Sequence, residues 1–196
     1  MFSDGDGTVA VRTARAASEA ETEGKLYDAI LPQPFSENMG VFVTISEHPS
    51  HDLRACIGYP EPIMPLRDAL VLAARGACHD PRFPPLTLDE ARSCVFEVTL
   101  LTPPEKIHYK GSEDLMSQIV LGKDGLIASR GPNRGLLLPQ VPDEWGWNIK
   151  EYLDAVCTKA GMRSDAWMSG SVKFEKFQGE IFSERLPGGP VERVSQ

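Results

Sequence analysis

The stretch Leu53-Arg54-Ala55-Cys56-Ile57-Gly58 decides how the first part of this chain folds. Residues 40–45, Gly-Val-Phe-Val-Thr-Ile, precede it and are rich in the β-branched and aromatic residues that favour strands. The turn-forming residues 48–52 separate the two stretches, so a β-hairpin is predicted. Alternate residues of a strand share a face, which directs one set toward the core and the other away from it. The core-facing set is expected to be Leu53, Ala55 and Ile57, and the opposite set Arg54, Cys56 and Gly58.

Arg54 and Cys56 are expected on the same face of the strand, and this has a chemical consequence. A guanidinium beside a thiol favours the thiolate, which is the reactive form of cysteine. The alternative is that Cys56 is a small buried hydrophobe, as most free cysteines are. A nucleophilic Cys56 would need a base within hydrogen-bond reach, for which His51 and His79 are the candidates. Adjacent His79 and Asp80 would be awkward joint metal ligands with Cys56, so no metal site is predicted.

Residues 80–86, Asp-Pro-Arg-Phe-Pro-Pro-Leu, form the second stretch with chemical potential. Its prolines restrict the backbone and hold Arg82 and Phe83 in place at low entropic cost. A guanidinium in such a position is suited to clamping a carboxylate or a phosphate. The alternative is that Arg82 forms a structural salt bridge with Asp80 or Glu97.

Two further carboxylates complete the candidate site. Glu97 lies on a half-apolar strand face. Glu144 lies beside Trp145 and Trp147, where it is a general acid/base, a ligand contact or an ordinary surface carboxylate on a turn. The candidate catalytic residues are therefore Arg54, Cys56, Asp80 and Arg82. The candidate substrate-binding residues are Gly58, Phe83, Glu97, Glu144 and Trp147.

Helical and strand patterns both occur along the rest of the chain. Helices are predicted at residues 8–23, 65–79, 112–120 and 148–160, with a helical turn at 25–31 and a short helix opened by the capping box Thr87-x-x-Glu90. Strands are predicted at 94–101, 125–129, 135–138 and 172–182. The pattern indicates a single domain over residues 1–186 and a disordered Gly- and Pro-containing tail over 187–196.

The composition limits the classes of function. The chain has 196 residues and a formal net charge of −8, which argues against a general nucleic-acid binder. No apolar run approaches the ~20 residues of a membrane span, and the acidic N-terminus lacks the layout of a secretion signal. The four cysteines form no C-x-x-C pair, so we expect reduced thiols in a cytoplasmic protein.

Eight motifs in a fixed order connect the chain to a known family. They are GVFVTI (40–45), LRACIG (53–58), DPRFPPL (80–86), EVTLLTPPE (97–105), GKDGLI (122–127), GLLLPQV (135–141), EWGW (144–147) and CTKAG (157–161). In this order the chain resembles the AMME-region candidate protein family, with its AMMECR-type domain, over roughly residues 25 to 182. The family usually has Gly where this chain has Ala55, in an LRGCIG motif. Because Ala does not easily take positive φ, the departure weakens any interpretation of the motif as a phosphate-cradling nest.

The resemblance implies an α+β fold with a largely antiparallel sheet flanked by helices, and two unequal lobes with a cleft between them. It implies no settled reaction and no known cofactor. Such domains often accompany Memo-like and radical-SAM proteins, which suggests a shared modification pathway by association alone.

Two hypotheses follow for the function. In the first, the chain is an enzyme or enzyme subunit in which Cys56 acts on a small anionic substrate. In the second, it is a non-catalytic binding or adaptor module, and the Pro-rich segment engages a partner protein.

Overall fold

The computed structural model describes residues 2–28 and 30–194, and divides the chain into two compact units. The first unit contains Met1–Pro103 and Glu180–Gln196, and the second contains Pro104–Gly179. Each unit has its own sheet and its own hydrophobic core. No helix in the described part of the chain has the length and apolar character needed to cross a membrane.

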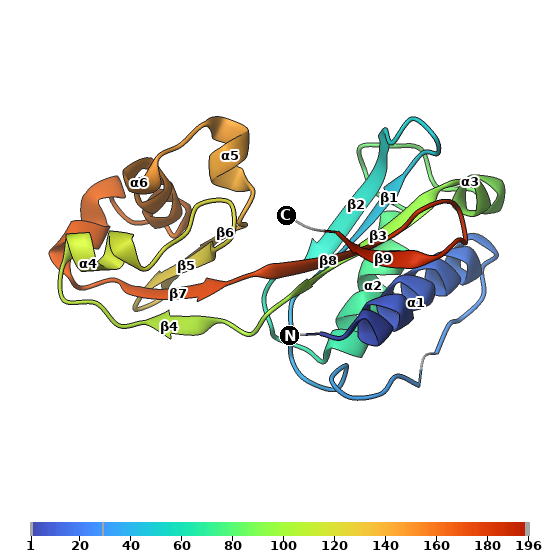
Figure 1. Cartoon of the computed structure of the whole chain (residues 1–196), viewed down its shortest axis with the longest axis horizontal. Coiled ribbons are helices and arrows are strands. Elements are labelled where there is room, and N and C mark those ends of the chain that lie inside the picture. The colour runs from blue at the N-terminus through green and yellow to red at the C-terminus, as the bar shows by residue number, and fades with distance from the viewer. Residues whose placement is uncertain (1, 29, 195–196) are drawn as a thin grey trace. The chain divides into compact units, whose positions relative to one another are not determined.

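The first unit is built on a five-stranded sheet in the order β2-β1-β3-β8-β9 (Figure 1). Its strands are β1 (Val41–Ser46), β2 (Leu53–Tyr59), β3 (Val95–Leu101), β8 (Gly179–Glu184) and β9 (Val191–Val194). β1 pairs antiparallel with both β2 and β3, and β8 pairs antiparallel with β9. The predicted hairpin of β1 and β2 is thus confirmed, and β2 forms an edge of the sheet.

Two helices pack on the sheet of the first unit, α1 (Asp4–Thr22) and α2 (Leu66–Ala77) (Figure 1). Both present small residues, including Ala10 and Ala14 of α1 and Ala73 of α2, all fully buried. Small side chains let helices approach a sheet closely, and β-branched and aromatic strand residues fill the space between them. The third helix, α3 (Leu88–Ser93), opens with the predicted Thr87/Glu90 capping box.

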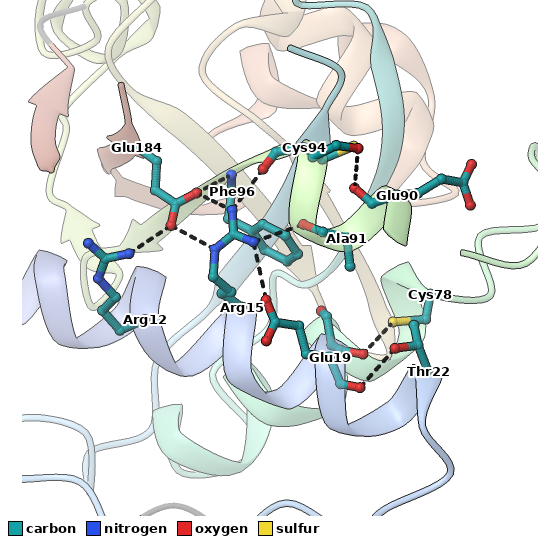
Figure 2. Close-up of polar contacts among 12 residues, drawn as sticks. Arg12, Arg15, Glu19, Thr22, Cys78, Glu90, Ala91, Cys94, Phe96 and Glu184 are labelled. Atoms are coloured by element: carbon teal, nitrogen blue, oxygen red, sulfur yellow. Dashed lines mark hydrogen bonds and ion pairs between the residues drawn. The ribbon is translucent and has the colours of Figure 1, made fainter. Parts of the chain in front are cut away.

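A buried polar network connects α1 to the sheet of the first unit (Figure 2). The Arg15 guanidinium donates to Glu184 from Nε at 2.8 Å and from Nη2 at 2.5 Å. It also donates to the backbone carbonyls of Ala91 and Cys94, at 2.8 and 2.7 Å. Glu184 in turn accepts hydrogen bonds from Arg12 and from the backbone N–H of Phe96. One ion pair therefore joins α1, α3, β3 and β8.

The second unit has a four-stranded sheet in the order β4-β7-β5-β6. Its strands are β4 (Glu105–Ile107), β5 (Gly125–Arg130), β6 (Asn133–Leu137) and β7 (Lys173–Phe177), and every described pair is antiparallel. Its helices are α4 (Ser112–Ser117), α5 (Val141–Trp145), α6 (Ile149–Lys159) and the 3-10 helix η1 (Ser164–Ser169).

The main helix of the second unit, α6, packs closely on β5 and β6. It follows the cap residue Asn148, the first residue of the helix predicted at 148–160, whose side chain accepts from the backbone N–H groups of Lys150 and Glu151. The approach to β6 requires glycine at position 135, because a Cβ there would come within 2.4 Å of the backbone nitrogen of Ala160. Helices and antiparallel sheets together confirm the predicted α+β class.

Three predicted boundaries differ from the structure near helix ends. α1 begins at Asp4 rather than residue 8, because Ser3 and Asp6 form a capping box. None of the described residues from 25 to 31 is helical, since two prolines follow closely and disfavour the helical conformation before them. The helix predicted at 112–120 is α4, which begins at Ser112 after the cap residue Gly111 but ends at Ser117.

Two predictions about the C-terminal part are corrected. The single strand predicted at 172–182 is divided into β7 and β8, which pair within different sheets. The alternation of apolar and polar residues indicates which face of a strand a side chain occupies, but not which neighbouring strand it pairs with. The pattern therefore could not predict that this segment divides between two sheets. The tail predicted to be disordered instead contains β9, in which Val194 pairs with Ile181 across the ladder with β8.

Candidate functional site

The strand that carries Cys56 contains a bulge at Arg54. Ile45 of β1 pairs with Ala55 and Ser46 pairs with Leu53, so Arg54 is the extra residue between them. A bulge interrupts the alternation of faces and redirects a side chain. Leu53 is consequently 43% exposed rather than core-facing, whereas Ala55 is fully buried and Ile57 packs against the core as predicted.

Arg54 therefore turns away from the Cys56 thiol, toward the segment before α3. Its Nε donates to the carboxylate of Glu90 at 3.1 Å, and its Nη2 donates to the carbonyl of Pro84 at 3.0 Å. The Arg54 hydrogen bond is the main cause that lowers the pKa of Glu90 to about 2. The predicted contact between this guanidinium and the thiol is not among the described contacts, and Arg54 instead fixes the Pro-rich segment against β2.

Asp80 and Arg82 occupy the free edge of β2 at Cys56. The Asp80 carboxylate accepts from the backbone N–H of Cys56 at 2.9 Å, and Arg82 Nη2 donates to the Cys56 carbonyl at 3.0 Å. Two side chains thus take the hydrogen bonds that a neighbouring strand would provide. An edge strand whose N–H and C=O groups are occupied in this way is fixed in position and protected from pairing with another chain.

Asp80 and Arg82 also bind each other. Arg82 donates to Asp80 from its backbone N–H, from Nε and from Nη2, at 3.1, 3.0 and 2.6 Å. The Arg82 hydrogen bond, reinforced by the backbone N–H groups of Cys56 and Arg82, lowers the pKa of Asp80 well below its ordinary value despite burial. The Asp80 side chain is shielded from solvent, whereas that of Arg82 is 53% exposed. Asp80 therefore stays charged at neutral pH and anchors the segment to β2, and Arg82 Nη1 makes none of the described hydrogen bonds.

The Phe83 ring lies near two guanidinium groups, that of Arg54 on β2 and that of Arg82 in its own segment. Its ring centroid is 5.9 Å from Cζ of Arg54 and 5.6 Å from Cζ of Arg82. Cations at this range of a ring face are attracted by its quadrupole. Four predicted site residues, Arg54, Asp80, Arg82 and Phe83, are thus linked to one another, and two of them, Asp80 and Arg82, bind the Cys56 backbone.

The side chain of Cys56 belongs to a polar row across three strands, which we call the Cys56 row: Cys56 of β2, Thr44 of β1 and Glu97 of β3. Thr44 pairs with Cys56 on one side and with Glu97 on the other, and directly paired residues share a face. The Thr44 hydroxyl donates to the Cys56 sulfur at 3.5 Å. The strands of Cys56 and Glu97 are two spacings apart, about 9–10 Å, so a bound molecule above Thr44 would reach both.

Glu97 has an unusual environment within the Cys56 row. Burial raises its pKa above the ordinary value, and none of its described contacts is an ion pair or side-chain hydrogen bond. A carboxyl group of this kind holds its proton at higher pH and is suited to act as a general acid. Glu97 was predicted as a substrate-binding residue, and that role stays a prediction.

Cys56 differs from the other three cysteines. Cys78, Cys94 and Cys157 are buried, and desolvation raises the pKa of each, that of Cys157 to about 11. Cys56 is half-buried and accepts a hydrogen bond from a hydroxyl.

The two histidines considered as bases do not contact the thiol in the described structure. His79 Nε2 lies 3.0 Å from the Glu21 carboxylate, and its side chain is 61% exposed. His51 occupies the β1–β2 turn with a φ of 62°. Among residues 2–28 and 30–194, no group of three or more His, Cys, Asp or Glu side chains is arranged to hold a metal ion.

The remaining predicted residues have local structural explanations. Gly58 pairs with Phe42, and a Cβ there would lie 2.3 Å from the Phe42 ring, so packing accounts for the glycine. Glu144 and Trp147 belong to the second unit, where Glu144 is exposed on α5. Trp147 packs against the core of that unit and stacks on Trp145, with ring centroids 5.8 Å apart. Their proposed ligand contacts stay predictions.

Thr44 is the functional candidate that the sequence interpretation missed. It is the polar residue of an otherwise apolar stretch, Val41 to Ile45, and the predicted hairpin places it near the strand of Cys56. Only the register identifies it as the direct partner of both Cys56 and Glu97. That register depends on the bulge at Arg54, which hydrophobic alternation does not reveal.

Replacing Glu97 with Gln should stabilise the protein in a pH-dependent way. The pKa of Glu97 is raised in the folded state, so its contribution to stability is full below the ordinary value of 4.5 and is lost as pH rises through the folded pKa. The variant should therefore match the wild type near pH 4 and exceed it at pH 7. Urea denaturation at both pH values measures the difference, with the exposed Glu105→Gln variant as a control. If the variant is less stable than the wild type at pH 7, the description of Glu97 as a desolvated carboxyl group without an ion-pair partner is wrong.

Comparisons with known proteins agree with this structure along most of the chain. The AMMECR1 family model matches residues 9–182. A protein of Methanocaldococcus jannaschii is 48% identical over 188 residues, covering 95% of this chain and 94% of that relative. A protein of Aquifex aeolicus is 46% identical over 166 residues, covering 84% of this chain and 85% of that relative.

A solved structure shows the same fold. The crystal structure of an uncharacterized protein from Pyrococcus horikoshii is similar with a TM-score of 0.79 and 44% sequence identity, covering 100% of this chain and 99% of that chain. The family model and the relatives confirm the resemblance inferred from the ordered motifs. The chain therefore belongs to the AMMECR1 family.

Proposed function

We propose that the protein is a cysteine-dependent enzyme, or a subunit of one, in which Cys56 is the nucleophile. The observation that carries the proposal is the contrast among the four cysteines. Cys56 is half-buried and accepts a hydrogen bond from Thr44, whereas the other three are buried with raised pKa values. Nucleophilic cysteines occur in partly exposed places where the thiolate is stabilised.

The neighbouring groups support a division of roles. Asp80 and Arg82 hold the backbone of Cys56 from both its N–H and its C=O, so they act as positioning residues. Arg82 also retains an Nη1 that makes none of the described hydrogen bonds, which favours a small anionic substrate. In the proposed step, the Cys56 thiol loses its proton to solvent and its sulfur forms a bond to an electrophilic centre of the substrate. The bond to the leaving group breaks, and Glu97 supplies the proton that the leaving group takes.

The proposed setting is cytoplasmic, alongside Memo-like and radical-SAM proteins in a modification pathway. Its support is the association that accompanies the family resemblance. The alternative function is a non-catalytic adaptor, favoured by the exposure of Pro81, Pro84 and Pro85 in a segment that Arg54 and Asp80 hold rigid.

Alkylation of each cysteine, followed separately by mass spectrometry across a pH series, tests the proposal. Cys56 should react with iodoacetamide at least about tenfold faster than the buried cysteines in the native protein. The Thr44→Val variant should slow Cys56 alkylation because it removes the hydroxyl that donates to sulfur. Thr99→Val is the matched control, since Thr99 lies on the same strand face as Glu97 but pairs with Phe42.

The outcomes distinguish enzyme from adaptor. Fast Cys56 alkylation that depends on Thr44 and not on Thr99 supports the nucleophile. If Cys56 reacts only after the protein unfolds, the cysteine is structural, and the adaptor becomes the better explanation.

A further inference from the structure

The second unit contains a pocket of about 380 Å³ that lies among its own residues. It is formed at one end of β4, β7 and β5, and its walls include Lys106, His108, Tyr109, Ser129, Lys173 and Glu175. Its volume falls within the range of small-molecule sites, roughly 300–1,000 Å³. None of the residues proposed above for the thiol chemistry lines it.

The strand register brings the cationic groups of the pocket together. Lys106 of β4 pairs with Glu175 of β7, and Lys173 of β7 pairs with Ser129 of β5. Lys173 is two residues from Glu175, so the two lysines are diagonal neighbours on one face, about 7–8 Å apart at their backbones. Each flexible side chain can then direct its ammonium group to a common point above Ser129.

The charges in the pocket are unbalanced. In the described part of the chain, neither Lys106 nor Lys173 forms an ion pair, although both are exposed. The carboxylate of the pocket, Glu175, is engaged by Arg134 at 3.2 Å. The pocket therefore contains two ammonium groups without an ion-pair partner, the His108 imidazole and the Ser129 hydroxyl. Its one carboxylate, that of Glu175, already has a cationic partner. This excess is local, because the chain as a whole carries a net charge of −8.

One wall of the pocket is rigid. The Tyr109 hydroxyl donates to the carbonyl of Val172 at 2.6 Å, and its ring meets Phe174 edge-on with centroids 6.0 Å apart. Phe174 belongs to the core of the second unit, so this wall is anchored from behind. Small-molecule sites usually combine a preformed wall of this kind with a few polar groups that determine the orientation of the ligand.

We propose that this pocket binds a small phosphorylated molecule, with Lys106 and Lys173 holding the phosphate and Ser129 donating a hydrogen bond to it. Lysine binds phosphate as a compact point charge and does not need the planar geometry that arginine imposes. A phosphate group offers acceptors in several directions, which suits donors that converge from two strands. The site is independent of the proposed thiol chemistry, so either can fail alone.

Titration of the full ¹⁵N-labelled chain with pyrophosphate at constant ionic strength tests this proposal. Pyrophosphate is the probe because it presents the anionic group without a particular organic partner. The backbone amides of Ser129 and Lys173 should shift and saturate. The double variant Lys106→Gln/Lys173→Gln should weaken binding by roughly tenfold or more, because it removes both point charges.

Two further variants make the test specific. Lys110→Gln/Lys123→Gln removes the same total charge from exposed positions of the same unit outside the pocket, and should leave binding within about twofold. Glu175→Gln should tighten binding because it removes the one anionic group of the pocket. The proposal is overturned if the pocket amides do not shift up to about 10 mM probe. Equal weakening by both double variants also overturns it, since binding would then follow net charge rather than this pocket.

Discussion

Replacing Glu184 with Gln is expected to lower the free energy of unfolding by about 3–5 kcal/mol, the largest effect that we predict for a single substitution. The Glu184 side chain is fully buried and accepts two hydrogen bonds from Arg15, one from Arg12 and one from the Phe96 backbone. The amide would leave the buried Arg15 guanidinium with Glu19, a partly exposed carboxylate at 3.3 Å, as its remaining countercharge. It would also place an NH₂ group against a donor, which cannot form a hydrogen bond.

Chemical denaturation of the wild type and the variant measures the loss. Glu192→Gln is the matched control, because Glu192 pairs with Arg185 at the surface on β9, the strand beside that of Glu184. An exposed ion pair contributes about 0–1 kcal/mol, so the control should differ little from the wild type. Similar losses in both variants would show that the network around Arg15 does not hold α1 to the sheet as described.

Replacing Asp80 with Asn should cost about 2–3 kcal/mol. The carboxylate accepts four hydrogen bonds, from the Cys56 and Arg82 backbones and from two nitrogens of the Arg82 guanidinium. An amide oxygen cannot serve all of these donors, and the amide nitrogen adds another donor beside them. The edge of β2 would then lose the side-chain cap that positions Cys56.

The pH dependence of this variant gives an independent check. The folded-state pKa of Asp80 is lowered, so its stabilisation is fully present above the ordinary value of 3.8 and is lost as pH falls toward the folded pKa. The gap in unfolding free energy between wild type and variant should therefore be constant near neutral pH and narrow below about pH 4. Asp89→Asn, at an exposed position in the first turn of α3, should cost less than about 1 kcal/mol. If the difference in unfolding free energy between wild type and Asp80→Asn does not narrow in acid, the charge of Asp80 is not what stabilises the edge of β2.

The candidate site was partly accessible from the sequence. Cys56 on a strand, and the rigid segment that contains Asp80 and Arg82, follow from β-propensity and proline placement. Their mutual contact does not, because the Cys56 backbone and the Asp80 side chain are 24 residues apart and meet only when the segment folds back along the edge of β2. The Arg54 side chain shows the opposite outcome. Strict alternation predicted it beside the thiol, and a one-residue bulge turned it to Glu90.

The sequence by itself determined the family, the α+β class, the β1–β2 hairpin, the capped start of α3 and the position of α6. These features depend on local periodicity, on capping side chains within three residues, and on motif order along the chain. Only the tertiary structure decided which strand each alternating segment joins, and so which residues share a row with Cys56. It alone revealed the Arg15–Glu184 pair, whose members are 169 residues apart. The physical reason is that register, bulges and buried ion pairs depend on contacts between distant segments. These contacts produce no periodic sequence pattern in either segment.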